Sequence, residues 1–196
     1  MVIAIANEPC NARYRIVKPE ILKSEGVPVS LSIYDAAIPG MVRALKNLDA
    51  ILDKAAAYAE RKKVDPTILM GSRLAIDMLP FSTQIHRATE TARGGAARLA
   101  QMDIARFPDE DKTVADLKDR LAKTIAFLES MPTETFTGAE DRTITQKLAG
   151  KDMTFPAKQY LFGFLIPNFY FHVTTAYAIL RHNGVEIGKI DYIRGI

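Results

Sequence analysis

The sequence lacks a second cysteine and a long apolar run. Its single cysteine, Cys10, cannot form an internal disulfide, which favours a reducing compartment such as the cytoplasm. No apolar run reaches the roughly 18 residues that a membrane-spanning helix needs. Gly163, Pro167 and Asn168 interrupt the most hydrophobic segment. The sequence therefore predicts a cytoplasmic protein with no membrane partner.

A cluster of like charges is also missing. The 26 basic and 23 acidic residues are scattered along the chain and give a formal net charge of +3. Surfaces that bind nucleic acid gather basic residues, so this distribution predicts no nucleic-acid partner. No glycine-rich phosphate loop follows a strand pattern, and no serine lies in a nucleophile-elbow sequence.

The chain is long enough for one substantial core, with 196 residues of which 48% are hydrophobic. Residues 1–29 are rich in charge and lack the apolar core of a secretory signal. We expect a peripheral N-terminal arm over residues 1–29 and one domain over residues 30–196. An alternative is that the true start lies near Ser30, which N-terminal sequencing of the native protein would reveal.

Apolar residues recur at helical spacing in four segments. These segments are residues 32–62, 65–100, 113–128 and 156–183. Ser32 and Thr113 each precede an Asp by three residues, the pattern of a capping box. Pro80 must kink or split the second helix, and Gly184 supplies the stop of the fourth.

Between residues 131 and 155 the helical period disappears, and residues 144–148 and 153–155 predict a small hairpin. Four long amphipathic helices without a strand-rich half predict an all-α fold, a four-helix bundle.

The most informative segment is residues 168–184, an apolar helix that contains polar groups. Asn168, His172, Thr175, Ile179 and His182 share one stripe of it. Polar side chains in a buried helix need partners or a ligand. His172 lies one turn after Asn168, so both can meet a common partner. The alternative is a neutral core histidine that bonds to Asn168 or to another helix.

The other histidines fit structural roles. His182 lies ten residues after His172, or roughly 15 Å along the helix, so the two cannot share a metal ion. A position in the last helical turn suits a cationic His182. His86 precedes Glu90 by four residues, which predicts a solvated face with a local ion pair.

Partners for His172 are expected from the other helices. Asp77 and Gln84 lie seven residues apart in the second helical segment and are expected to project inward, while Tyr34 and Asp35 could close the same end. Asp77 is alternatively an exposed residue beside the proline kink or a partner of Arg73, and Asp35 a simple cap. We expect a ligand pocket formed by Tyr34, Asp77, Gln84, Asn168 and His172.

Four stretches resemble a known bacterial family: LSIYD at 31–35, RLAIDM at 73–78, ARLA at 97–100 and FHVTTAYAILRHNGV at 171–185. Residues 31–192 are similar to the family of unknown function numbered 1993, in the DinB/YfiT-like superfamily. The resemblance implies a DinB-like four-helix bundle with up-down-down-up topology, often a homodimer, with a pocket at one end.

The resemblance also raises a divalent metal, zinc or nickel, as a cofactor. Three histidines commonly hold an ion in the wider superfamily, and the positions that match them are Gln84, Asn168 and His172. Only His172 keeps the pattern, so it is the candidate metal ligand, with Asp77 or a water-bridged Gln84 as its partner. Asn and Gln are poor ligands for zinc or nickel, which makes the site degenerate.

Three functions remain open from the sequence. The first is binding of an unidentified small molecule in a buried polar pocket. The second is a metal-dependent hydrolase, or a thiol-dependent transferase or isomerase, that uses His172. The third is a purely structural dimer with a satisfied polar core.

Overall fold

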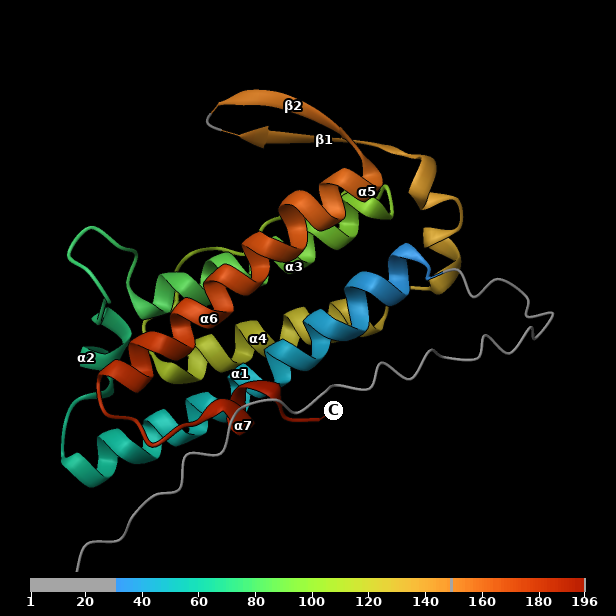
Figure 1. The fold of residues 1–196 in the computed structure, drawn as a ribbon. Coiled ribbons are helices and arrows are strands. Elements are labelled where there is room, and N and C mark those ends of the chain that lie inside the picture. Colours follow the sequence, from blue (N-terminus) through green and yellow to red (C-terminus); the bar gives the residue numbers. More distant parts are fainter. Residues whose placement is uncertain (1–30, 149, 196) are drawn as a thin grey trace, which may run out of the picture. The chain divides into compact units, whose positions relative to one another are not determined.

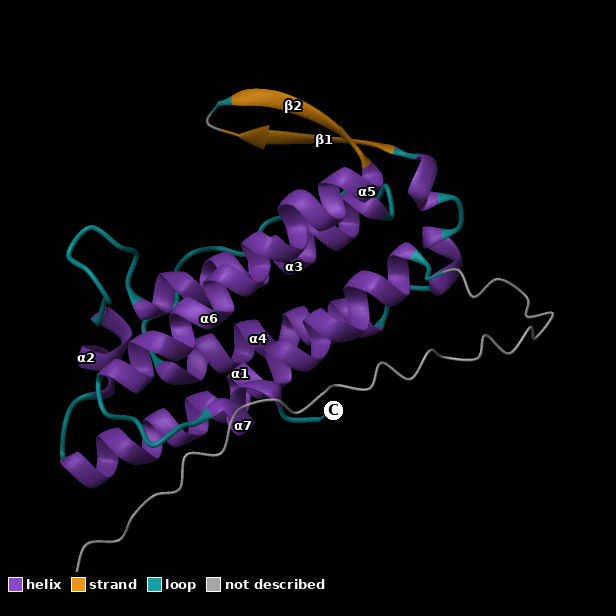
Figure 2. Ribbon diagram, in the orientation of Figure 1, coloured by secondary structure: helices purple, strands orange, loops and turns teal. Residues whose placement is uncertain are grey.

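The computed structural model of this chain describes residues 31–148 and 150–195, and the arm expected over residues 1–29 lies outside them. Within the described residues the chain is mostly helical, with one short two-stranded sheet (Figure 2). Both the helical class and the hairpin agree with the sequence prediction. No helix in these residues combines the length and the apolar character that a bilayer crossing requires.

Four long helices hold most of the core (Figure 1). Helix α3 packs against α6 and α4, and α1 packs against α4 and α6. Burial of each large aliphatic or aromatic side chain between them stabilises the fold by about 1.5–3 kcal/mol. The bounds of these helices are Ile33–Lys62 for α1, Phe81–Leu99 for α3, Val114–Glu129 for α4 and Ile166–His182 for α6.

Two of these helices begin at the capping residues that the sequence predicted. At α4, the N–H of Asp116 donates to Oγ1 of Thr113 at 3.1 Å, and the N–H of Thr113 donates to the Asp116 carboxylate at 2.9 Å. At α1, the N–H of Asp35 donates to Oγ of Ser32 at 3.0 Å. Each cap satisfies a free N–H group of the first turn and stabilises its helix by about 1 kcal/mol.

The second predicted helix is split. Helix α2 covers Pro66–Gly71, and α3 begins only at Phe81, so residues 72–80 form a connection between them. Pro80 immediately precedes α3 with an extended backbone, because proline cannot supply the N–H that a continuous helix needs. Asp77 therefore lies in a connection and not on a helical stripe.

The last predicted helix contains one wide turn. It consists of α5 (Ala157–Tyr160), the π-helical turn η3 (Leu161–Leu165) and α6. Pro167 follows the π turn, where a regular α-helix would press its ring against the carbonyl of Gly163. The wider turn relieves that clash. Gly184 ends the helix with a φ of 88°.

Short elements connect and close the long helices. After α4 come the 3-10 turns η1 (Thr133–Phe136) and η2 (Ala139–Asp141), and then the antiparallel strands β1 (Thr143–Leu148) and β2 (Lys151–Pro156). Helix α7 (Lys189–Ile193) packs against α1 and was not predicted from the sequence. Its end is fixed by Nδ2 of Asn47, which donates to the carbonyls of Tyr192 at 2.9 Å and Arg194 at 3.0 Å.

Candidate functional site

The imidazole of His172, on α6, meets the amide of Gln84, on α3. Nδ1 of His172 lies 2.8 Å from Oε1 of Gln84. Nε2 of Gln84 donates to the carbonyl of Leu79 at 3.0 Å, which turns the amide oxygen toward the imidazole. Nδ1 of His172 must therefore carry the proton, and Nε2 keeps its lone pair.

His172 is neutral at pH 7. Burial, with a smaller contribution from the charge of Arg87, lowers the pKa of His172 to about 4. The partner oxygen belongs to an uncharged amide, which does not stabilise an imidazolium as a carboxylate would. The free Nε2 of His172 can thus accept a hydrogen bond from another molecule.

Asn168 forms a second polar link between the same two helices. Its Nδ2 donates to Oγ1 of Thr91, on α3, at 3.0 Å. The polar groups of α6 thus find partners on a neighbouring helix, as buried polar groups must. Gln84, Asn168 and His172 lie together at the α3–α6 contact.

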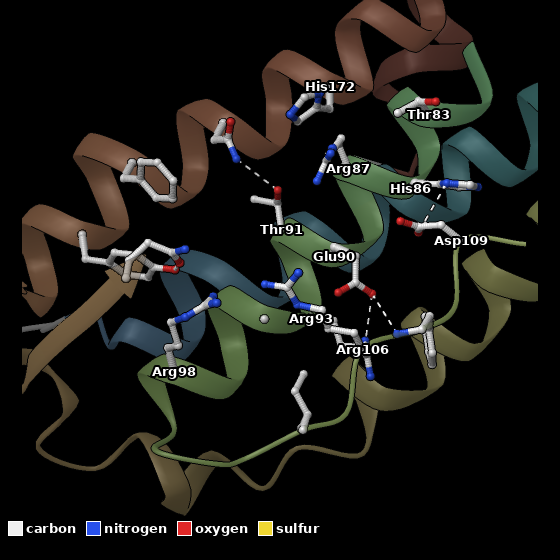
Figure 3. A pocket seen from close by; sticks show the side chains of 17 residues that line it. Thr83, His86, Arg87, Glu90, Thr91, Arg93, Arg98, Arg106, Asp109 and His172 are labelled. Carbon is white, nitrogen blue, oxygen red and sulfur yellow. Dashed lines mark hydrogen bonds and ion pairs between the residues drawn. The ribbon is translucent and has the colours of Figure 1, made fainter. Parts of the chain in front are cut away.

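A cavity of about 280 Å³ lies beside these links (Figure 3). Helix α6 contributes Asn168 and His172 to its wall, and α3 contributes residues from 83 to 98. Residues 104–109, from the connection between α3 and α4, form a further part, and Gln146 and Tyr160 line it from β1 and α5.

Two buried arginines hold the connection between α3 and α4 in place. Nη2 of Arg93 donates to the carbonyl of Ala105 at 2.5 Å, and its guanidinium carbon lies 3.7 Å from the centroid of the Phe107 ring. Nε of Arg120, on α4, donates to Asp111 at 2.5 Å. These contacts fix the wall of the cavity that residues 104–109 provide.

His86 differs from its prediction as a solvated residue paired with Glu90. Its side chain is only 12% exposed, with Nε2 2.7 Å from Oδ2 of Asp111 and Nδ1 3.5 Å from Oδ1 of Asp109. Burial, followed by the charge of Arg120, lowers the pKa of His86 although both carboxylates oppose the shift. The prediction failed because residues 101–113 fold back over this face of α3.

The charge of the cavity wall is positive. Glu90 accepts hydrogen bonds from Nη2 of Arg93 at 3.2 Å and from the N–H of Phe107 at 3.4 Å. Asp109 lies 3.6 Å from Nη2 of Arg120 and near His86. Both carboxylates of the wall are therefore engaged by protein groups, while four arginines line it: Arg87, Arg93, Arg98 and Arg106.

None of these arginines was predicted as a site residue. Arg87, Thr91, Gly94 and Arg98 recur at intervals of four, three and four, so they share one stripe of α3. Charged residues on an amphipathic helix normally face water, so this stripe predicts a solvated face. The pattern that could indicate a site is the same stripe, because it carries an arginine at each end and a glycine between them.

Tyr34 and Asp77 do not join the site, contrary to the sequence prediction. The ring of Tyr34 packs against Phe136, with ring centroids 5.4 Å apart. Asp77 is exposed in the connection between α2 and α3. Neither residue lines the cavity, and Gln84 reaches it only through its contact with His172. For Asp77 the physical reason is the early end of α2, which removes the helical phase that would have turned it inward.

The donor atoms here do not fit the metal site that the family resemblance implied. Oε1 of Gln84 already accepts from His172, and Asn168 offers only an amide oxygen, a poor ligand for zinc or nickel. Only Nε2 of His172 remains as a nitrogen donor among the three. Across the part of the chain that the structure describes, no three His, Cys, Asp or Glu side chains are grouped to hold an ion. This set suits neither zinc nor nickel.

Comparison with known proteins gives a family and a related fold. Residues 33–193 match the family described as a domain of unknown function, DUF1993. A crystal structure of a DinB family member protein from Shewanella denitrificans is 42% identical, with a TM-score of 0.77. The match covers 83% of this chain and 92% of that chain. Among curated proteins, none matches this chain.

Proposed function

The chain belongs to the DUF1993 family, and on that premise we propose that it binds a small organic molecule in the cavity between α3 and α6. The proposal includes a DinB-like four-helix bundle with up-down-down-up topology, formed by α1, α3, α4 and α6. A homodimer is a further part of the proposal, because the family resemblance implies one.

The free Nε2 of His172 carries the proposal. Its lone pair has no partner among the described residues, and the residue lines a cavity of about 280 Å³. Pockets for small ligands combine apolar walls with a few placed polar groups. Here Phe164 and Tyr160 provide apolar and aromatic surface, and Asn168 and Thr91 provide polar groups beside His172. A ligand with a hydroxyl, thiol or N–H group would donate to Nε2.

A ligand screen by thermal unfolding tests this proposal, because a molecule that binds only the folded state raises the melting temperature. Hits that bind the wild type should lose about tenfold or more in affinity in His172→Ala. His182→Ala is the matched control, since His182 lies in the last turn of the same helix and is exposed. Equal affinity of His172→Ala and the wild type for every hit would contradict the proposal.

The same variants separate the other two functions. A purely structural dimer predicts that His172→Ala loses stability while ligand binding stays unchanged. A metal-dependent hydrolase or transferase predicts stoichiometric metal in protein purified without added metal, and its loss in His172→Ala. Elemental analysis of wild type and His172→Ala therefore distinguishes the metal enzyme from the binding protein.

A further inference from the structure

The cavity holds more arginine charge than the protein neutralises. Glu90 and Asp109 are the carboxylates of its wall, and both are engaged by Arg93, Arg120 or His86. Within residues 31–148 and 150–195, no carboxylate lies within ion-pair distance of Arg87, Arg98 or Arg106. Cationic groups that share a wall repel one another, so an anion between them would stabilise the arrangement.

Gly94 leaves space for the guanidinium of Arg98 in the cavity wall. A Cβ at this position would lie 3.0 Å from Nη1 of Arg98, so the Arg98 guanidinium folds back along α3 over Gly94. The charge of Arg98 also acts on Tyr160, whose pKa is raised by burial and lowered by this guanidinium. The side chain of Arg98 thus extends from α3 toward Tyr160 of α5, in the wall of the cavity.

The connection between α3 and α4 brings Arg106 to the same region. Its neighbours in the chain, Ala105 and Phe107, are both held by Arg93. Arg93 therefore holds the backbone on both sides of Arg106. The guanidinium of Arg93, which is 5% exposed, still has one N–H group, at Nε, without a hydrogen-bond acceptor within the described residues.

We propose that the ligand of this cavity carries a carboxylate or phosphate group that lies at Gly94, between Arg98 and Arg106. This inference rests on the proposed function and adds the charge of the ligand and the part of the cavity that recognises it. Arginine suits this role because its planar guanidinium donates two parallel hydrogen bonds to an oxyanion.

The two recognition elements lie apart. The charge of Arg87 acts on the pKa of His172, so Arg87 marks the His172 end of α3. Gly94 lies seven residues further along the same helix, or roughly 10 Å along its axis. The ligand is therefore an elongated molecule, with an oxyanion at one end and a hydrogen-bond donor for His172 at the other.

Calorimetric titration of the full chain at low ionic strength tests the inference, because salt screens exposed charges. The probes are succinate, inorganic phosphate and the uncharged succinamide. We expect saturable binding of succinate or phosphate, and the stronger of the two identifies the anion type. Affinity should fall about tenfold or more in Arg98→Gln and Arg106→Gln. Arg181→Gln, an exposed arginine in the last turn of α6, should bind as the wild type does.

Gly94→Ala is a second variant, in which the added methyl group displaces the Arg98 guanidinium without removing its charge. It should weaken anion binding at unchanged fold, as judged by circular dichroism. Absence of saturable binding to both anions would overturn the inference, as would equal affinity in Arg98→Gln and Arg181→Gln.

The two proposals fail in different ways. Binding of uncharged hits that depends on His172, with no binding of either anion, would leave the proposed function intact and remove the oxyanion site. Anion binding that depends on Arg98, with no hit of the ligand screen weakened in His172→Ala, would support the oxyanion site and contradict the role of His172.

Discussion

Nη1 of Arg98 lies 3.0 Å from the point at which a Cβ on Gly94 would stand, and this contact involves the far end of a flexible side chain. The next residue on α3 is different. A Cβ on Gly95 would lie 2.1 Å from Cδ1 of Leu165, in the packed contact between α3 and the π turn. A methyl group can thus be accommodated at Gly94, whereas Gly95 leaves no space for one.

Gly94→Ala should stabilise the protein. Glycine inside a helix costs up to about 1 kcal/mol relative to alanine, and the Arg98 guanidinium can move aside. The free energy of unfolding, measured in urea, should therefore rise by up to about 1 kcal/mol. A decrease would show that the Arg98 guanidinium cannot move aside.

Gly95→Ala should destabilise the protein, although the same gain in helix propensity applies. Its methyl group would overlap Leu165, and overpacking of a core typically costs about 1–3 kcal/mol. Shortening the neighbour in Gly95→Ala/Leu165→Ala should recover part of the overpacking loss, which a double-mutant cycle measures. Additive effects in the cycle would contradict a direct contact between the two positions.

Stability should decrease as the pH falls from about 6.5 to about 4, the range between the ordinary pKa of histidine and the pKa of His172. The folded state resists protonation of His172, so the unfolded state takes up more protons in this range. The loss should be on the order of 1–3 kcal/mol after allowance for solvent. Urea unfolding at pH 7 and at pH 4.5 measures it.

The control for this pH dependence is the difference between variants. His172→Ala should lose stability less steeply over the same range, because it lacks the group that titrates. His182→Ala, whose side chain is exposed, should follow the wild type. Identical slopes for the wild type and His172→Ala would contradict a half-buried His172 that stays neutral.

Gln84→Glu should raise the pKa of His172. The new carboxylate would stand where Oε1 of Gln84 now lies, 2.8 Å from Nδ1 of His172, and would stabilise the imidazolium. We expect a rise of about one to three pKa units in an NMR titration of the ring. Gln159→Glu, at an exposed position of α5, adds the same charge and should leave the titration unchanged.

Local signals explain which parts of the fold the sequence predicted. The caps at Ser32 and Thr113 and the stop at Gly184 depend on a few neighbouring residues, and their helices agree with prediction. Gln84 and His172 meet because each lies on the inward side of a long helix. Asp77 was misplaced because a proline indicates an interruption but does not say how many residues the interruption takes.

The cationic part of the cavity depends on contacts between distant residues. Arg98 and Arg106 line the same cavity only because residues 101–113 fold back over α3, held by Arg93 and Arg120. No local pattern in that irregular segment indicates such a return. From the sequence alone, a stripe of charged residues on α3 therefore predicts a face in contact with water.

The π turn has a consequence for the angular order of the cavity wall. Tyr160, Phe164, Asn168 and His172 line the cavity at a regular spacing of four residues. In an α-helix of 3.6 residues per turn, such a row drifts by about 40° at each step and would leave the cavity. The wide turn at Leu161–Leu165 underwinds the helix over the first of these steps and offsets part of this drift. One local change of helical pitch thus lets a single helix present an aromatic end and a polar end to the same space.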